Sequence, residues 1–192
     1  KYLCAFPKSG EKAEFLCNKP DCTHNDLSCN GLLTNDSVYG IQYYEGFLYY
    51  TVIGSGSIDL YKVNLDGSER ERVCNLATVE THGDGANSIN WIIHRGSIYY
   101  VYRMEAGETE DGYYLNGSNC IYRRDLEETQ DSELLMAVNC GMDSQYVPLK
   151  GYGSYLYFVS PEELEGEGTV YRYNTESDKL EKMQELGNDV TD

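Results

Sequence analysis

The chain has 192 residues and a formal net charge of −17, with 32 acidic against 15 basic residues. A surface this acidic repels nucleic-acid phosphates and anionic lipid head groups, so the charge argues against both as partners. No segment approaches the roughly 18 consecutive apolar residues of a membrane span, and we expect no membrane insertion of this part of the protein. The 19 tyrosines favour pleated, half-buried surfaces and predict strands.

The first predicted elements are two strands at residues 2–6 and 13–17, joined by a turn at 8–10. A complete set of four follows, at residues 41–44, 47–53, 58–65 and 71–76, with tight turns at Glu45-Gly46 and Asp66-Gly67-Ser68. A second set runs over residues 88–140 and a third over residues 146–186. The last strand of the third set, at 180–186, has helical propensity, but its position in the repeat predicts a strand.

Two phrases recur in each set and indicate a repeat protein. A glycine followed by aromatic residues occurs at 46–50, 96–100 and 153–158, and a phrase with tyrosine before a basic residue follows at 60–64, 121–125 and 170–174. A repeat of about 40 to 50 residues with several short strands is typical of a β-propeller blade. We therefore expect Tyr49, Tyr99 and Tyr157 to be equivalent, and likewise Tyr61, Tyr122 and Tyr171.

The predicted fold is an all-β β-propeller segment of about three and a half four-stranded blades. Residues 1–38 form the outer half of a preceding blade and a connection rich in cysteine and histidine, and blades follow at 39–87, 88–145 and 146–192. Closed propellers need roughly four to eight blades. The chain also opens inside an expected strand, without a signal peptide. We therefore expect a longer gene product, a partner chain that completes the ring, or self-association through an unpaired edge.

Two segments resemble known families. The first complete set reads Leu48-Tyr49-Tyr50-Thr51 and then Val63-Asn-Leu-Asp-Gly-Ser-Glu-Arg70. It resembles the low-density-lipoprotein-receptor type of propeller repeat, with Tyr50 where that family has Trp and Val52 where it has Asp. The segment from Cys17 to Cys29 resembles bacterial surface lipoproteins of unknown function with related repeats. These resemblances imply an extracytoplasmic, cell-surface module of six-bladed type without enzymatic activity.

The residues most indicative of a site are Cys17, Cys22, His24 and Cys29, which lie within 13 residues of one another in the sequence. Three thiolates and one imidazole are a known ligand set for structural zinc. In an oxidising compartment two of these cysteines can instead form a disulfide, with His24 uninvolved, and a third alternative is free thiols in a loop. The total of seven cysteines is odd, so at least one is unpaired within the monomer in any disulfide scheme.

A second candidate is a binding surface of loop residues. In a four-stranded meander, the loop between the second and third strands emerges on the same side as the connection between blades, and binding residues often occupy such loops. A solvated acidic fringe is the alternative interpretation. The residues expected on this rim are His82, Asp84, Glu105, Glu108, Glu110, Asp111, Glu162 and Glu163.

The function predicted from these features is a non-catalytic binding or scaffolding module, with a protein or carbohydrate ligand. No nucleophile elbow, zinc-protease helix or phosphate loop occurs in the sequence. Two alternatives stay open: a fragment of a propeller-based hydrolase or lyase, and a purely structural assembly arm. A structural zinc ion is the only cofactor that the sequence indicates, and the disulfide stays open as the alternative for the same cysteines.

Overall fold

The computed structural model describes residues 1–6, 8, 10, 12–33, 38–54, 56–78, 89–104, 118–127, 131–139, 149–161 and 168–186. Within these ranges the regular elements are β-strands only. The chain divides into two compact units, Lys1–Ser88 and Ile89–Asp192. No helix in the described part is long and apolar enough to span a membrane.

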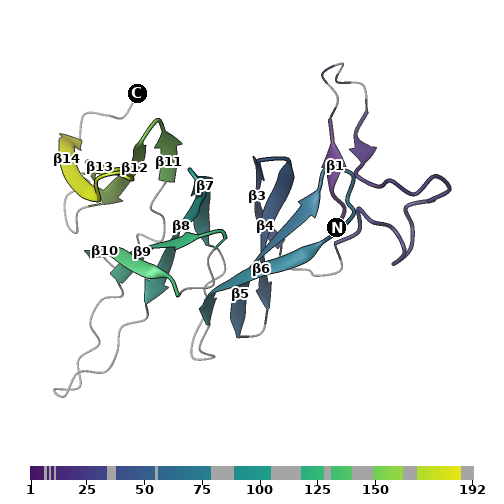
Figure 1. The fold of residues 1–192 in the computed structure, drawn as a ribbon, viewed down its shortest axis with the longest axis horizontal. Coiled ribbons are helices and arrows are strands. Elements are labelled where there is room, and N and C mark those ends of the chain that lie inside the picture. The colour runs from purple at the N-terminus through teal and green to yellow at the C-terminus, as the bar shows by residue number, and fades with distance from the viewer. Residues whose placement is uncertain are drawn as a thin grey trace. The chain divides into compact units, whose positions relative to one another are not determined.

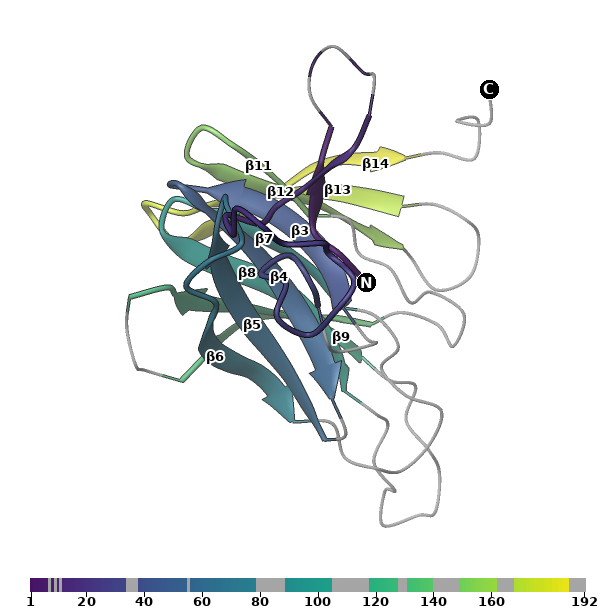
Figure 2. The same cartoon turned by 90° about the vertical axis from the view of Figure 1, so that its right-hand side faces the viewer.

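The first unit contains one four-stranded antiparallel sheet whose strands follow one another in chain order (Figures 1 and 2). The expected tight turn is confirmed, because Glu45 and Gly46 both adopt positive φ, at 45° and 92°, as a two-residue hairpin turn requires. All four predicted strands are confirmed, although the first begins earlier than expected. The strands are β3 (Val38–Tyr44), β4 (Phe47–Gly54), β5 (Ser57–Asn64) and β6 (Glu71–Thr78).

The same unit begins with a two-stranded sheet formed by β1 (Cys4–Ala5) and β2 (Glu14–Phe15). These strands are shorter than the predicted 2–6 and 13–17. After β2 the Leu16 N–H still donates to the Leu3 carbonyl oxygen, at 3.0 Å, but the chain then leaves the sheet and enters the cysteine-rich connection. The prediction of half a blade before the first complete one is therefore confirmed in its pairing, but not in its length.

The second unit contains two further four-stranded antiparallel sheets, each in sequential order. The predicted strand at the end of the repeat is confirmed as β14, despite its helical propensity. The strands of the first sheet are β7 (Asn90–His94), β8 (Ser97–Met104), β9 (Ser118–Asp125) and β10 (Glu133–Asn139). Those of the second are β11 (Leu149–Tyr152), β12 (Tyr155–Pro161), β13 (Gly168–Asn174) and β14 (Lys179–Leu186).

The strand registers confirm both sets of equivalent tyrosines. The residue pairs Tyr49–Lys62, Tyr99–Arg123 and Tyr157–Arg172 lie opposite each other in the three sheets. On the other face of each sheet the next aromatic pair is stacked, with interplanar angles of 14°, 19° and 14°. These stacked pairs are Tyr50–Tyr61, Tyr100–Tyr122 and Phe158–Tyr171.

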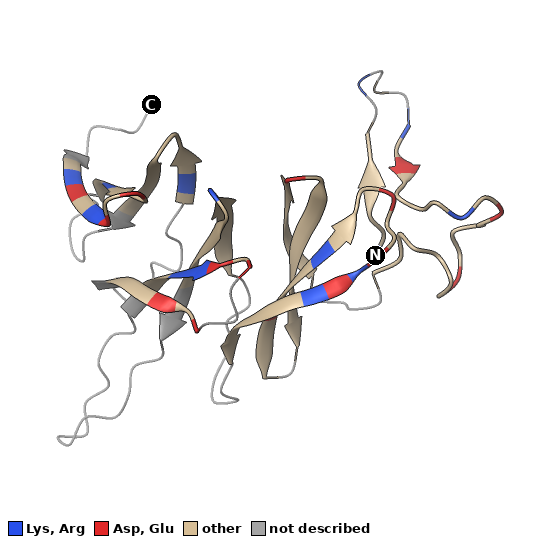
Figure 3. Ribbon diagram, in the orientation of Figure 1, with Lys and Arg blue, Asp and Glu red and all other residues tan. Residues whose placement is uncertain are grey.

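Charged residues on the outer strands are paired across the ladders. Lys62 bridges to Glu71 at 2.6 Å in the first unit, and Arg172 bridges to Glu181 at the same distance in the second. Figure 3 shows basic and acidic segments next to one another on β6 and β14. All 15 Lys and Arg residues of the chain fall in the described ranges, so most of the excess acidity belongs to the other segments of the sequence.

Each unit has its own apolar core between sheet faces. In the first unit, residues of the N-terminal segment cover one face of the four-stranded sheet, and in the second unit the core joins the two sheets. The buried residues of the first core are Leu3, Leu33, Tyr50, Val52 and Val63. Those of the second are Tyr99, Val101, Ile121, Leu149, Leu156, Phe158 and Tyr173.

Candidate metal centre

The four predicted ligands converge in the connection between β2 and β3. The ligand atoms of Cys17, Cys22, His24 and Cys29 all lie within 4.8 Å of one another. Cys29 is buried, and the other three side chains are partly exposed. This cluster can bind a metal ion, as the sequence predicts.

Two tight turns bring the cysteines together. The first turn is at residues 20–21, where the Cys22 N–H donates to the Lys19 carbonyl oxygen at 3.3 Å. A second turn ends at the last ligand, where the Cys29 N–H donates to the Asp26 carbonyl oxygen at 3.2 Å. Neither segment contains a strand, so the connection is ordered by local hydrogen bonds and by what the side chains contact.

The imidazole of His24 is held from two sides. Its Nδ1 atom lies 3.3 Å from the Cys29 Sγ atom. Its ring stacks on Phe15, with ring centres 4.5 Å apart and an interplanar angle of 24°, and Phe15 in turn contacts the edge of Tyr2. His24 also adopts a positive φ of 55°, an uncommon conformation for a residue with a side chain. The ring is therefore fixed toward the thiols by packing from β2.

The electrostatics of the cluster favour a thiolate at one position. Hydrogen bonds from the backbone N–H groups of Lys19 and Asn30 lower the pKa of Cys17 to about 6, against the effect of burial. At Cys22 the backbone N–H of His24 acts to lower the pKa of the thiol. Burial and the neighbouring Cys17 and Cys29 side chains outweigh this effect, so the net shift of the pKa is upward. Backbone N–H donors directed at a sulfur are the environment that stabilises a metal-binding thiolate.

The donor set and its spacing fit zinc. Tetrahedral zinc with sulfur at about 2.3 Å and imidazole nitrogen at about 2.0–2.1 Å places neighbouring ligand atoms about 3.6–3.8 Å apart. The distance between His24 Nδ1 and Cys29 Sγ, 3.3 Å, is close to this value, and all four ligand atoms lie within 4.8 Å of one another. The three cysteines of this cluster are not joined by a disulfide.

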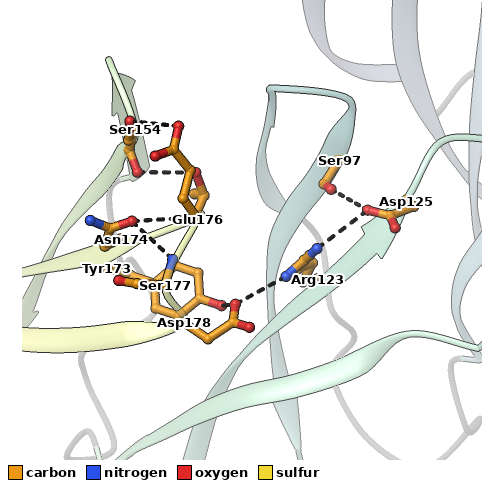
Figure 4. A network of polar contacts seen from close by, with 10 residues as sticks. Ser97, Arg123, Asp125, Ser154, Tyr173, Asn174, Glu176, Ser177 and Asp178 are labelled. Atoms are coloured by element: carbon orange, nitrogen blue, oxygen red, sulfur yellow. Dashed lines mark hydrogen bonds and ion pairs between the residues drawn. The ribbon is translucent and has the colours of Figure 1, made fainter.

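A second polar cluster lies in the second unit, between β9 and the turn that joins β13 to β14 (Figure 4). Arg123 contacts Asp178 at 3.3 Å and Asp125 at 3.7 Å, and the Tyr173 hydroxyl donates to Asp178 at 2.6 Å. Burial and this bond to Asp178 raise the pKa of Tyr173 to about 12, so its hydroxyl stays protonated. A nearby bridge joins Arg95 to the same turn. The cluster therefore joins the two sheets of the unit by ion pairs and hydrogen bonds, which is a structural role.

The predicted rim lies outside the described residues, all eight positions included. The histidine of β7, His94, is partly buried. It packs against Gly151, where an added Cβ would lie 2.4 Å from the His94 Nδ1 atom. Burial lowers the pKa of His94, and its Nε2 atom has no hydrogen-bond partner in the described part of the chain.

The sequence did not indicate which residues of the first complete blade contact the loop from Cys17 to Cys29, here called the metal loop. These are Asp66, Gly67 and Arg70, which contact the loop from the turn between β5 and β6. The Asp-Gly-Ser phrase indicated a turn, but nothing in the sequence indicated what the turn contacts.

Comparison with protein-family models finds no match, and no curated protein matches the chain. Among solved structures, the chain is similar to TolB from Acinetobacter baumannii, with a TM-score of 0.56 and 14% sequence identity, over 95% of this chain and 37% of TolB. A chain of a nidogen/laminin complex matches with a TM-score of 0.48 and 15% identity, over 92% of this chain and 52% of the other. The chain thus spans only part of the structures that it matches.

The likeness to TolB concerns the fold. Sequential antiparallel four-stranded sheets, repeated three times after a two-stranded half, are the blades of a β-propeller. The chain is therefore a segment of a β-propeller, with a thiol and imidazole cluster at its first blade connection.

Proposed function

We propose that this propeller segment is a non-catalytic binding or scaffolding module that acts outside the cytoplasm, and that a structural zinc ion fastens its first blade connection. The convergence of three thiols and one imidazole within 4.8 Å carries the zinc assignment. A disulfide would use only two of these four groups, and it would not require His24 to be stacked in place beside Cys29. Four protein ligands leave no open position for water or substrate, so the role of the ion is structural.

The binding role is supported by the architecture. Rigid antiparallel sheets position their loops, and loops on rigid scaffolds carry binding residues. The acidic residues of the chain concentrate in the segments between strands, which favours a ligand with basic or hydrogen-bonding groups, such as a protein or a carbohydrate. The resemblance to surface-lipoprotein and receptor repeats supports an extracytoplasmic, cell-surface location.

Metal analysis and thiol titration of protein purified without reductant test the zinc assignment. We expect about one equivalent of zinc per chain, and a chelator should expose the three cluster thiols to a thiol reagent. Cys4→Ser is a matched control, since Cys4 is exposed and outside the cluster, and it should remove one thiol without changing the zinc content. A zinc content below about a tenth of an equivalent per chain, with thiols that react only after reduction, would show a disulfide in place of the zinc site.

Binding is tested on panels of extracellular glycans and proteins. We expect a ligand whose binding is lost when the acidic rim residues are changed together to their amides. Binding that is unchanged in this amide variant would show that the ligand site lies elsewhere.

A further inference from the structure

We propose that packing of the turn between β5 and β6, at residues 66–68, against the loop from Cys17 to Cys29 increases the metal affinity of this loop. Metal binding would in turn favour the packing of the turn. The inference rests on the proposed zinc site and adds a determinant of metal affinity that is not a ligand. Gly67 is the central residue, and Asp66 and Arg70 hold the turn in place.

Gly67 is inserted between the two ends of the metal loop. A Cβ atom on Gly67 would lie 2.1 Å from the Leu16 carbonyl oxygen and 3.2 Å from the carbonyl carbon of Asn30. Leu16 directly precedes Cys17, and Asn30 directly follows Cys29. The turn therefore contacts the backbone next to the first and the last ligand, and only a residue without a side chain fits there.

Side-chain hydrogen bonds connect the turn to the same two ends. Asn18 Nδ2 donates to Asp66 Oδ2 at 2.9 Å, and Asn30 Nδ2 donates to Asn18 Oδ1 at 2.6 Å. Arg70 donates from its two terminal nitrogens to the carbonyl oxygens of Asn30 and Leu32, at 2.8 and 2.9 Å. These hydrogen bonds connect the loop to the first four-stranded sheet. The Asn18–Asp66 bond joins residues that are 48 positions apart in the sequence.

These contacts make the coupling reciprocal. The docked turn restricts the backbone beside Cys17 and Cys29, which reduces the entropy that the loop loses when a metal fixes its ligands. By linkage, a metal that fixes both ends of the loop must favour docking of the turn by the same factor. Groups that support metal ligands from outside typically change metal affinity by about 10- to 100-fold when they are altered.

Gly67→Ala tests the proposal, with Gly46→Ala as its matched control. Both glycines adopt positive φ in hairpin turns of the same sheet, at 80° and 92°, so the two substitutions strain the backbone similarly. Only at Gly67 would the added methyl group meet the metal loop, because nothing lies within 4 Å of the Cβ position at Gly46. We expect zinc affinity, measured by competition with a chromogenic chelator, to fall about 10- to 100-fold in Gly67→Ala and to stay within about threefold of wild type in Gly46→Ala.

A second readout separates coupling from a general loss of stability. The gain in melting temperature on adding zinc should shrink in Gly67→Ala and persist in Gly46→Ala, whereas simple destabilisation would lower the zinc-bound and zinc-free values together. If Gly67→Ala does not fold, hydrogen exchange of the wild type decides. Removal of zinc should accelerate exchange of the Gly67 N–H, bonded to the Asn64 carbonyl oxygen, and leave the Thr175 N–H of the second unit unchanged.

The outcomes distinguish the two proposals. Wild-type protein that binds no zinc overturns the zinc site itself. Zinc binding with equal affinities in the two alanine variants, or turn exchange that ignores zinc, leaves the site intact and overturns the coupling.

Discussion

Truncation of Tyr99 to alanine should be among the most destabilising changes in the second unit. The Tyr99 side chain is 1% exposed and lies in the core between the two sheets. Replacing a fully buried aromatic residue by alanine costs about 3–5 kcal/mol. The edge-to-face contact with Tyr173, with ring centres 6.4 Å apart and an interplanar angle of 63°, accounts for about 0.5–1.5 kcal/mol of that cost. We expect a loss of about 4 kcal/mol in the free energy of unfolding.

Tyr157→Ala is the matched control, because it changes the same position of the repeat. Tyr157 lies opposite Arg172 on β13, as Tyr99 lies opposite Arg123 on β9. Its side chain is only partly buried, so less apolar surface is returned to water. At about 25 cal/mol per Å² of apolar surface, we expect a loss of about 1–2 kcal/mol.

Urea unfolding followed by fluorescence measures both variants. Trp91, in β7, is the only tryptophan of the chain and reports on the second unit. Equal losses for the two variants would refute the reasoning, because they would mean that position in the repeat, and not burial between sheets, sets the contribution of these tyrosines.

Three further predictions concern the first unit. Arg70→Lys should lower its free energy of unfolding by about 1–2 kcal/mol, because lysine cannot donate to the carbonyl oxygens of Asn30 and Leu32 together, and unchanged urea midpoints would contradict this. Burial acts to raise the pKa of Asp59, but hydrogen bonds, foremost from Arg72, outweigh it, and the net shift of the pKa is downward. Ionised Asp59 therefore stabilises the fold above its unfolded pKa of about 3.9, and this stability is lost as the pH falls through the lower folded pKa. Asp59→Asn should therefore flatten the loss of stability below about pH 4, and parallel acid profiles would argue against it. Chelation should loosen the first unit while the tryptophan fluorescence of the second keeps its urea midpoint, and a shift of that midpoint would show that the units do not respond separately.

Much of the fold could be predicted because its signals are local. Alternating aromatic residues, tight turns such as Glu45-Gly46 and the spacing of the repeated phrases depend on neighbours a few residues apart, and they determine strand limits and register. The ligand cluster was predictable for the same reason. Cys17, Cys22, His24 and Cys29 belong to one short connection, and the local turn at residues 20–21 brings the first two cysteines together.

Tertiary structure decided what covers these elements. Tyr99 and Tyr157 share one phrase and one register, yet only Tyr99 is buried, because burial depends on a second sheet and not on the strand itself. In the same way, Asp66-Gly67 was recognisable as a turn, but its place against Leu16 and Asn30 was not. Such contacts join residues far apart in sequence, and no local period records them. The sequence therefore determined the strands of each blade and the cluster of three thiols and one imidazole. Long-range packing decided which tyrosines form the cores and which glycine lies against the loop that carries this cluster.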